Sequence, residues 1–283
     1  MNIYKKLFNN SLIFAVGNLG SKFIVIFLVP LYTYHLSTSE FGMADLLTAT
    51  ITLLLPIFTL SISDAVLRFV MDKNYDKQAV LMNSLVVILV GFILLLAIYP
   101  ILIIMFPFHE YILYFYLLML SQSIFLTSTQ YIRANGMSKL FAASGIVNAL
   151  VLLLCNIMLL VILNKGIVGY LVSLIVSYII SAAFVSIFGK VHRDLNFKKI
   201  NKKLLKEMLL YSIPLMPNAI MWWVMGLSDR YIVTYFLGAS ANGLYAVANK
   251  VPSVLSIVNS IFFQAWQMSA IEEADSKDKS KIF

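Results

Sequence analysis

The stretch QAVLMNSLVVILVGFILLLAIYPILIIMFPF, residues 78–108, runs for 31 positions without a charged side chain. An α-helix needs about 20 apolar residues to cross the hydrocarbon core of a bilayer, so this stretch is long enough to span it. The whole chain of 283 residues is 61% hydrophobic and 12% charged, with a mean hydropathy of +0.90. Soluble domains are roughly half apolar and a quarter charged. The composition therefore predicts an integral membrane protein.

Comparable apolar runs recur along the chain and predict an all-α protein with about eight transmembrane helices. We expect these helices near residues 11–35, 42–70, 79–106, 111–132, 140–163, 167–189, 207–237 and 243–270. The chain has one cysteine, Cys155, within the fifth span. A single cysteine supports neither a disulfide framework nor a thiolate metal site.

Basic residues predict the orientation of these helices. If the N-terminus is cytoplasmic, 17 of the 21 lysines and arginines fall in cytoplasmic segments, and only Lys165 falls outside. Short cytoplasmic loops of membrane proteins carry an excess of Lys and Arg, so we expect the N-terminus inside. We attribute the net charge of +8 to this topology and to contact with anionic lipid, and not to nucleic acid.

The end of the chain resembles its beginning. A shift of 201 residues lays FGMADLLTATITLLLPIFTLSIS (41–63) over NGLYAVANKVPSVLSIVNSIFFQ (242–264), so that Gly42 matches Gly243. Polar residues recur on one helix face in both segments, which favours a shared water-filled cavity. Close packing of helices through small polar residues is the alternative. The expected cavity-lining polar residues are Asn18, Thr48, Thr52, Asn218, Asn249, Ser253, Ser256 and Ser260.

This repeat predicts two six-helix lobes related by an axis along the membrane normal. Residues 1–189 would form the complete first lobe, and residues 207–283 would begin the second with two helices and a cytoplasmic tail. The basic segment 190–206 between them is expected to be a cytoplasmic linker that folds as an amphipathic helix. Because the second lobe is incomplete, we expect these residues to be a fragment or a truncated product of a larger transporter.

Five ionisable residues lie deep in the predicted spans: Lys22, Arg230 and Lys250 are basic, and Asp45 and Asp229 are acidic. A charge near the bilayer centre costs roughly 2.5 to 3.5 kcal/mol, so such residues normally face a cavity or a partner. The excess of one base predicts a cationic cavity for an anionic ligand, especially phosphate, with the two acids as charge partners. A buried ion pair that locks helices together is the alternative, chiefly for Asp229.

Two further features of the spans predict local structure. Asp64 and Arg68 lie four residues apart near the end of the second span and predict a structural pair on one helix face. Pro214 and Pro217 predict a break or bend in the seventh span, because proline lacks a backbone N–H and clashes with the preceding turn.

Several segments together resemble a known family of membrane proteins. They are SLIFAVGNLGSKFIVIFLVPLYTYHLSTSEFGMADLLT (11–48), SDAVLRF (63–69), YIRANG (131–136) and YSIPLMPNAIMWWVMGLSDRYIVTYFLGASANGLYAVANKV (211–251). This set is similar to the oligosaccharide flippases of the multidrug/oligosaccharidyl-lipid/polysaccharide exporter superfamily. The most specific part contains Asp229, Arg230, Gly238 and the run 243–245.

The resemblance implies a function in the bacterial cytoplasmic membrane. Such a protein moves an undecaprenyl-diphosphate-linked oligosaccharide to the outer leaflet for capsule, O-antigen or exopolysaccharide assembly, by alternating access of two lobes. The implied partners are this lipid-linked glycan, membrane lipids, and the polysaccharide polymerase and chain-length proteins. No cofactor is implied.

Three other functions stay open at this point. A cation-coupled multidrug exporter of the same superfamily would need an acidic cavity, whereas the deep charges lean basic. A membrane-embedded glycosyltransferase or polymerase would need catalytic carboxylates, a metal or a large external loop, and the three histidines, His35, His109 and His192, are too dispersed for a metal cluster. An inactive or auxiliary fragment is the third. We therefore expect a transporter and not an enzyme.

Overall fold

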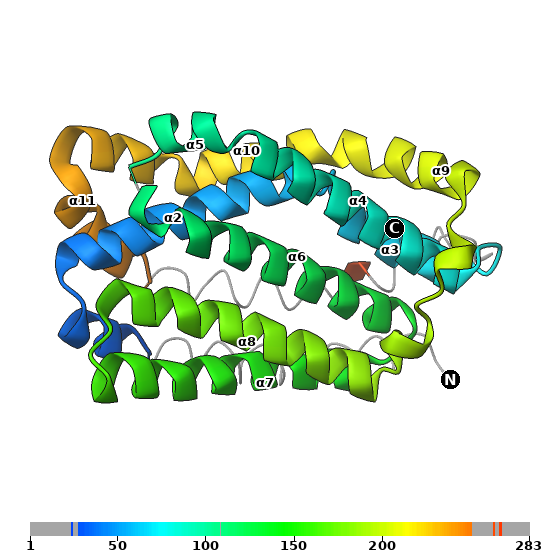
Figure 1. Cartoon of the computed structure of the whole chain (residues 1–283), viewed down its shortest axis with the longest axis horizontal. Coiled ribbons are helices and arrows are strands. Elements are labelled where there is room, and N and C mark those ends of the chain that lie inside the picture. The colour runs from blue at the N-terminus through cyan, green and yellow to red at the C-terminus, as the bar shows by residue number, and fades with distance from the viewer. Residues whose placement is uncertain (1–23, 25–27, 108, 251–262, 264–265, 268–283) are drawn as a thin grey trace.

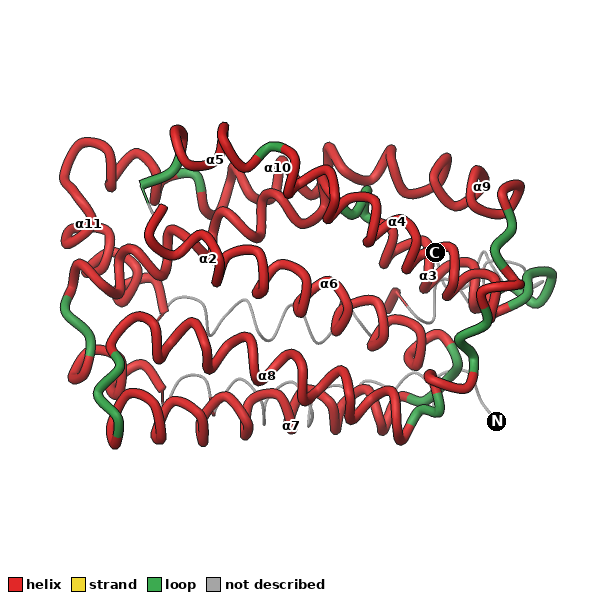
Figure 2. Tube along the Cα trace, in the orientation of Figure 1, coloured by secondary structure: helices red, strands yellow, loops and turns green. Residues whose placement is uncertain are grey.

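The computed structural model describes residues 24, 28–107, 109–250, 263, 266 and 267, and every regular element among them is a helix (Figures 1 and 2). Six segments of this described part are long and apolar enough to cross a membrane. The predicted all-α membrane fold is confirmed. Most of the first and eighth predicted spans lies outside the described residues.

The helices lie roughly along one axis, so the bundle has two ends (Figure 1). We call one the Ser37 end; it carries Ser37, the turn at 163–165 and Gly238. We call the other the linker end; it carries the turns at 72–76 and 135–137 and the linker. This naming makes no assumption about which end faces the cytoplasm.

The second predicted span is broken into two helices, α2 (Thr38–Phe58) and α3 (Ile62–Met71). Ser37 begins α2 with a capping box, in which its hydroxyl accepts from the Glu40 N–H and the Glu40 carboxylate accepts from the Ser37 N–H. Leu60 and Ser61 separate the helices with φ values of 51° and 50°. Two successive left-handed residues cannot continue a right-handed helix, so α3 starts in a new direction.

Prolines account for the break in the third span. It forms α4 (Lys77–Ala97) and α5 (Tyr99–Met105), with Pro100 in the first turn of α5, where a missing N–H is tolerated. The remaining helices of the predicted first lobe lie close to their predicted ranges. They are α6 (Ile112–Ala134), α7 (Ser138–Asn156), which continues as a π-helical turn (Ile157–Ile162), and α8 (Gly166–Phe188).

Helix α6 runs through the middle of the bundle and contacts α3, α4 and α8 (Figure 1). Towards the linker end, Ile62, Val80 and Ile132 belong to one buried apolar core. Towards the Ser37 end, α2, α5, α6 and α8 share a second core around Phe115, which is fully buried. The first core holds α3, and the second holds α2, against the other first-lobe helices.

The linker forms two 3₁₀ turns, Val191–Arg193 and Phe197–Lys199, before α9 (Lys202–Ser212) begins. The amphipathic helix that its basic pattern predicts is therefore present only over residues 202–206, where the linker enters α9. Asn201 caps α9, and the buried Asn83 side chain bonds both the N–H and the carbonyl of Asn201. These side-chain bonds satisfy the backbone locally and compete with a continuous helix.

The seventh span breaks where its prolines predict. A 3₁₀ turn (Ile213–Leu215) containing Pro214 separates α9 from α10 (Met216–Leu227). Helix α11 (Asp229–Lys250) follows and is kinked at Gly238, whose φ of 84° and ψ of 171° lie outside the helical region. The chain turns there, so the second half of α11 lies beside α2 at the Ser37 end (Figure 1).

Candidate functional site: the seam between α2 and α11

Two parts of the chain about 200 residues apart come into backbone contact where α2 meets α11. A Cβ atom at Gly42 would overlap the carbonyl oxygen of Ala239, and a Cβ atom at Gly243 would overlap the carbonyl oxygen of Thr38. Asn242 adds a hydrogen bond of 2.9 Å from its side-chain amide to the Gly42 carbonyl. Only glycine lets the two backbones come this close. We call this contact and its bonded neighbours the α2–α11 seam.

The two glycine contacts are equivalent in the repeat. The 201-residue shift that matches Gly42 to Gly243 also matches Thr38 to Ala239. Gly42 packs on Ala239, and Gly243 packs on Thr38, which is the counterpart of Ala239 in the repeat. Reciprocal contacts of this kind are what a two-fold relation between two equivalent helices produces.

A buried ion pair crosses the same seam. Arg230 Nε lies 2.7 Å from Asp45 Oδ2, and both side chains are about 10% exposed. Arg230 Nη1 also donates to the Gly226 carbonyl at 3.0 Å and lies 3.3 Å from Asp229 Oδ1. The other oxygen of Asp229 accepts from the Tyr245 hydroxyl. One guanidinium thus joins two carboxylates, and Asp45 brings α2 into the network.

Further polar contacts extend the α2–α11 seam toward α10. Thr50 and Tyr231 join their hydroxyls. The indole N–H of Trp223 donates to the Ala49 carbonyl at 2.8 Å. These bonds link residues in the middle of α2 to α10 and α11. The seam is therefore a specific interface and not a chance apolar contact.

The predicted basic cavity is only partly described. Lys22 lies outside the described residues, and the side chain of Lys250, the last residue of α11, is not described. Arg230 is described, and its charge is balanced by Asp45 and Asp229 in this conformation. Its direct binding of a substrate anion stays a prediction. Adjacent residues of a helix point about 100° apart, and Arg230 and Asp229 accordingly each have a second partner elsewhere.

The expected polar stripes are likewise described in part. Asn18, Ser253, Ser256 and Ser260 lie outside the described residues. Thr48 and Thr52 donate to carbonyls of their own helix at 3.0 and 2.9 Å, and Asn249 donates to the Tyr245 carbonyl at 3.1 Å. Asn218 is exposed on α10. That these residues line one cavity stays a prediction.

The predicted pair of Asp64 with Arg68 is wrong. Arg68 lies 3.8 Å from Asp72, four residues further along. Arg68 is on an exposed face of α3, whereas Asp64 is partly buried and interacts electrostatically with Arg133 of α6. Spacing alone does not distinguish the two acids, because Arg68 has one four residues away in each direction.

Arg133 is a buried cation that the sequence analysis placed among the basic loop residues. It is 2% exposed, near the linker end of α6. Its Nη1 donates to Gln130 Oε1 at 3.4 Å and to Gln267 Oε1 at 3.2 Å, and its guanidinium lies 5.6 Å from the centre of the Phe141 ring. The motif YIRANG at the end of a span was the available signal, but it does not reveal burial.

No three His, Cys, Asp or Glu side chains of the described part gather as a metal site.

The arrangement of the helices is similar to that of known structures. It has the fold of a MATE multidrug transporter, DinF-BH, which was solved with a bound ligand: the TM-score is 0.80 at 15% identity, with 98% of this chain and 67% of that chain covered.

Two other solved structures share the fold. A point mutant of a MATE protein matches with a TM-score of 0.75 at 12% identity, covering 100% of this chain and 69% of that chain. A MOP superfamily transporter from Pyrococcus furiosus, described as having a reversed polarity of its binding pocket, matches with a TM-score of 0.62 at 15% identity, covering 97% and 71%. The chain thus spans about two thirds of the length of these transporters.

The sequence itself identifies the family. The model of the polysaccharide biosynthesis protein family matches residues 7–267, so the chain belongs to that family. No curated protein matches it.

Proposed function

We propose that this chain is the larger part of a flippase that carries an undecaprenyl-diphosphate-linked oligosaccharide across the cytoplasmic membrane of a bacterium. Membership of the polysaccharide biosynthesis family supports the substrate class, and the transporter fold supports translocation. The observation that carries the proposal is the α2–α11 seam, where two repeat-related glycines and a buried ion pair join the two predicted lobes.

The seam suggests how access would alternate. Gly42 and Gly243 bring the two predicted lobes together at the Ser37 end, and in this proposal their contact closes that end. To open it, the lobes must separate at the crossing and break the bond between Asp45 and Arg230. A closed Ser37 end and an open Ser37 end would then be the two states that expose the substrate to opposite sides.

The basic loops support an orientation for this cycle. Among the described residues, Lys73, Lys139 and Lys199 lie in or beside turns of the linker end, whereas Lys165 lies at the Ser37 end. By the positive-inside rule the linker end faces the cytoplasm. A diphosphate leaving a negative cytoplasm then gains roughly 2.3 kcal/mol per charge for each 100 mV, so the membrane potential favours export. We expect the polymerase and chain-length proteins to receive the glycan outside.

A cation-coupled multidrug exporter is the second candidate, because the α2–α11 seam holds two carboxylates and one guanidinium. Carboxylates that lose a cationic partner when a seam opens can take up a proton or a sodium ion. The two carboxylates of the seam therefore support coupling to a cation, whereas the excess of basic residues predicted from the sequence does not.

Reconstitution of the full-length gene product separates the two functions. Liposomes would carry a polyprenyl-diphosphate oligosaccharide with a fluorophore on its glycan, and a membrane-impermeant quencher would report how fast the glycan crosses. We expect crossing well above the rate of protein-free liposomes, and no efflux of a cationic rhodamine dye. Crossing at the protein-free rate together with rhodamine efflux would overturn the flippase in favour of the drug exporter.

A further inference from the structure

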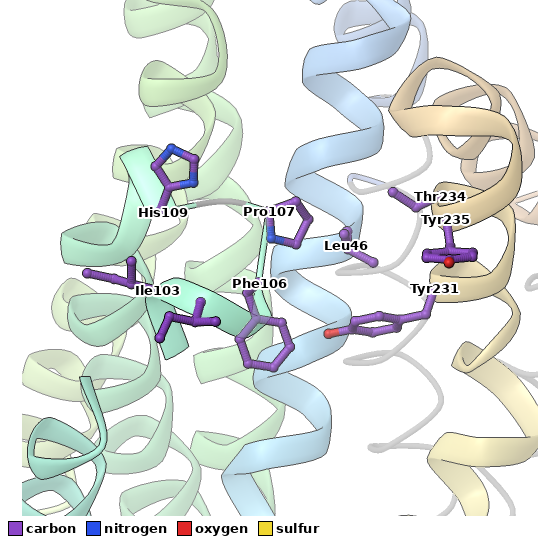
Figure 3. Close-up of a pocket in the computed structure, with 9 residues that line it drawn as sticks. Leu46, Ile103, Phe106, Pro107, His109, Tyr231, Thr234 and Tyr235 are labelled. Atoms are coloured by element: carbon purple, nitrogen blue, oxygen red, sulfur yellow. The ribbon is translucent and has the colours of Figure 1, made fainter. Parts of the chain in front are cut away.

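A groove lies beside the α2–α11 seam and shares Tyr231 with it. It has a volume of about 470 Å³ and is open on one side (Figure 3). Ile103 and Ile104 of α5 and the following Phe106 form one wall, and Leu46 and Tyr231 lie opposite, on α2 and α11. The groove is thus shared by helices of both predicted lobes.

The groove offers a ligand mainly apolar surface. The Tyr231 hydroxyl is bonded to Thr50, and the Thr234 hydroxyl donates to the Arg230 carbonyl at 2.7 Å. Both hydroxyls are therefore already satisfied within the protein. The Phe106 and Tyr231 rings meet edge to face, with their centres 6.3 Å apart. The remaining polar groups of the lining are the Tyr235 hydroxyl and the His109 ring, which both lie at the exposed rim, so the walls between them are apolar.

The groove is next to the charged part of the seam. Leu46 of the groove follows Asp45 in α2, and Tyr231 of the groove follows Arg230 in α11. Each residue of the ion pair is thus the chain neighbour of a residue that lines the groove. Ile104 and Tyr235, at 85% and 84% exposure, mark the open side. Because α2 and α11 belong to candidate membrane spans, the exposed side chains on this side suit contact with hydrocarbon. His109 lies at the rim nearest the Ser37 end and can face a headgroup (Figure 3).

We propose that this groove binds the polyprenyl chain of the lipid-linked substrate while the diphosphate and glycan pass between the lobes. The inference rests on the proposed function for the identity of the lipid. A chain held here stays in an apolar medium, and its headgroup lies close to the Asp45–Arg230 pair that must part. Opening of the seam moves α11 relative to α5, so the walls of the groove change together with access.

Binding in this groove depends on shape. The surrounding lipid is as apolar as the groove, so transfer out of water contributes nothing to the choice between them. Discrimination comes from van der Waals packing against fixed walls, here the rings of Phe106, Tyr231 and Tyr235 and branched aliphatic side chains. A substitution that fills the groove should therefore prevent binding without altering the charge or polarity of the protein.

The test uses the full-length protein in liposomes with a polyprenyl diphosphate that carries a diazirine in its chain. After irradiation, peptide mass spectrometry locates the labelled residues. The matched probe is a phosphatidylcholine with a diazirine in an acyl chain at the same mole fraction. We expect the polyprenyl probe to label residues 103–107 and 231–235 about fivefold more than the acyl probe does, which corresponds to a preference of about 1 kcal/mol.

Two substitutions on the same helix sharpen the result. Ile103→Trp fills the groove, whereas Ile101→Trp adds the same ring at a 53% exposed position of α5 that does not line it. We expect Ile103→Trp to lower labelling by the polyprenyl probe about fivefold and Ile101→Trp to leave it unchanged. If Ile103→Trp does not fold, competition by unlabelled polyprenyl phosphate in the parent protein replaces it, and dioleoyl phosphatidylcholine is the control competitor.

The outcomes separate this inference from the proposed function, because labelling needs no transport. Equal labelling by both probes, or labelling that neither Ile103→Trp nor the competitor lowers, would overturn the groove as a polyprenyl site. If the groove is labelled as expected and the glycan does not cross, the flippase fails and the polyprenyl site stands. If the glycan crosses and labelling is unselective, the flippase stands and the groove fails.

Discussion

Asp45 and Arg230 meet 2.7 Å apart in a seam where each side chain is about 10% exposed, so Asp45 depends on Arg230 for the balance of its charge, whereas Arg230 also has Asp229 at 3.3 Å. Removing one partner of a buried ion pair leaves an uncompensated charge, which costs about 3–5 kcal/mol, whereas replacing both by apolar residues is often neutral. We expect Asp45→Leu and Arg230→Leu each to lower the thermal stability of the detergent-purified protein strongly. The double variant should be more stable than either single variant.

This prediction has an internal control. Asp229 is 43% exposed and bonded to Tyr245, so it keeps a partner when Arg230 is removed. Asp229→Leu should therefore destabilise the protein less than Asp45→Leu does. A double variant whose loss equals the sum of the two single losses would mean that Asp45 and Arg230 do not act as a pair.

The sequence could predict part of this residue-level arrangement. It indicated that charges at membrane depth need partners, and that Asp229 and Arg230, being adjacent, point about 100° apart on a helix. It could not pair Arg230 with Asp45, because that choice depends on α2 crossing α11. For Arg68 it offered two acids at the same spacing, and the tertiary contact of Asp64 with Arg133 decided between them.

At the scale of elements, the crossing of α2 and α11 depends on its two glycines. Gly42→Ala would place a methyl group on the Ala239 carbonyl, and the helices would have to move apart. Overpacking of this kind costs about 1–3 kcal/mol. Gly226→Ala is the matched control, because Gly226 is also helical and nothing lies near its would-be Cβ. That change should be neutral or stabilise α10 by up to about 1 kcal/mol.

Thermal unfolding of the two purified variants checks this prediction. Gly42→Ala should unfold at a lower temperature than the parent, and Gly226→Ala at the same or a higher one. Equal melting temperatures for Gly42→Ala and the parent would show that α2 and α11 do not touch as described. Gly243→Ala should behave as Gly42→Ala does, since the two contacts are equivalent.

The linker carries an element-level prediction about pH. The Lys199 ammonium bonds Asp76 at 2.8 Å and holds the pKa of this carboxyl below its usual value. A lowered folded-state pKa contributes stability above the unfolded-state pKa, near 4, and this stability is lost as pH falls through the folded value. Both side chains are nearly half exposed, so the contribution is at most about 1 kcal/mol.

Thermal unfolding of the parent and Asp76→Asn across pH tests this sign. The parent should be slightly more stable at pH 7, and the difference should shrink as pH falls below about 4 and disappear once the pH is below the lowered pKa of Asp76. Lys198→Ala, which removes a neighbouring lysine without a described acidic partner, should leave the profile unchanged. A difference that grows on acidification would contradict the assignment.

Element boundaries show where sequence reasoning succeeds. Proline has a definite steric effect, so the break at Pro214 could be predicted. The break at Leu60 and Ser61 could not, because neither residue usually adopts positive φ and only the surrounding packing imposes it. The same limit applies to the linker, where the basic pattern suits a helix but the buried Asn83 holds an extended backbone at Asn201.

At the scale of the whole molecule, the second predicted lobe is attached at both ends of the bundle. At the linker end, Leu204 and Met208 of α9 belong to the same apolar core as α3 and α4. At the Ser37 end, α11 is fixed to α2 by the seam. If the lobes alternate as proposed, α9 stays with the first lobe and the motion begins at the 3₁₀ turn that contains Pro214. The boundary between the two moving lobes would then lie after α9, at the turn Ile213–Leu215.

This view predicts that locking the Ser37 end stops transport. In the full-length protein with its native cysteines, Cys155 among them, replaced by alanine, the pair Thr38→Cys and Ala239→Cys places two thiols beside the glycine crossing, one on each predicted lobe. A short bifunctional thiosulfonate should join them, abolish crossing of the fluorescent glycan, and release it again on reduction. Each single-cysteine variant, treated in the same way, should transport at the parent rate.

A second pair controls for cross-linking as such. Asp76→Cys and Lys199→Cys lie at the linker end, where the linker binds α4 and no contact has to open in the proposed cycle. The same reagent should join this pair and leave transport intact. Full transport by the protein cross-linked between Thr38→Cys and Ala239→Cys would mean that the α2–α11 seam stays closed throughout the cycle, and that the lobes exchange access by a movement elsewhere.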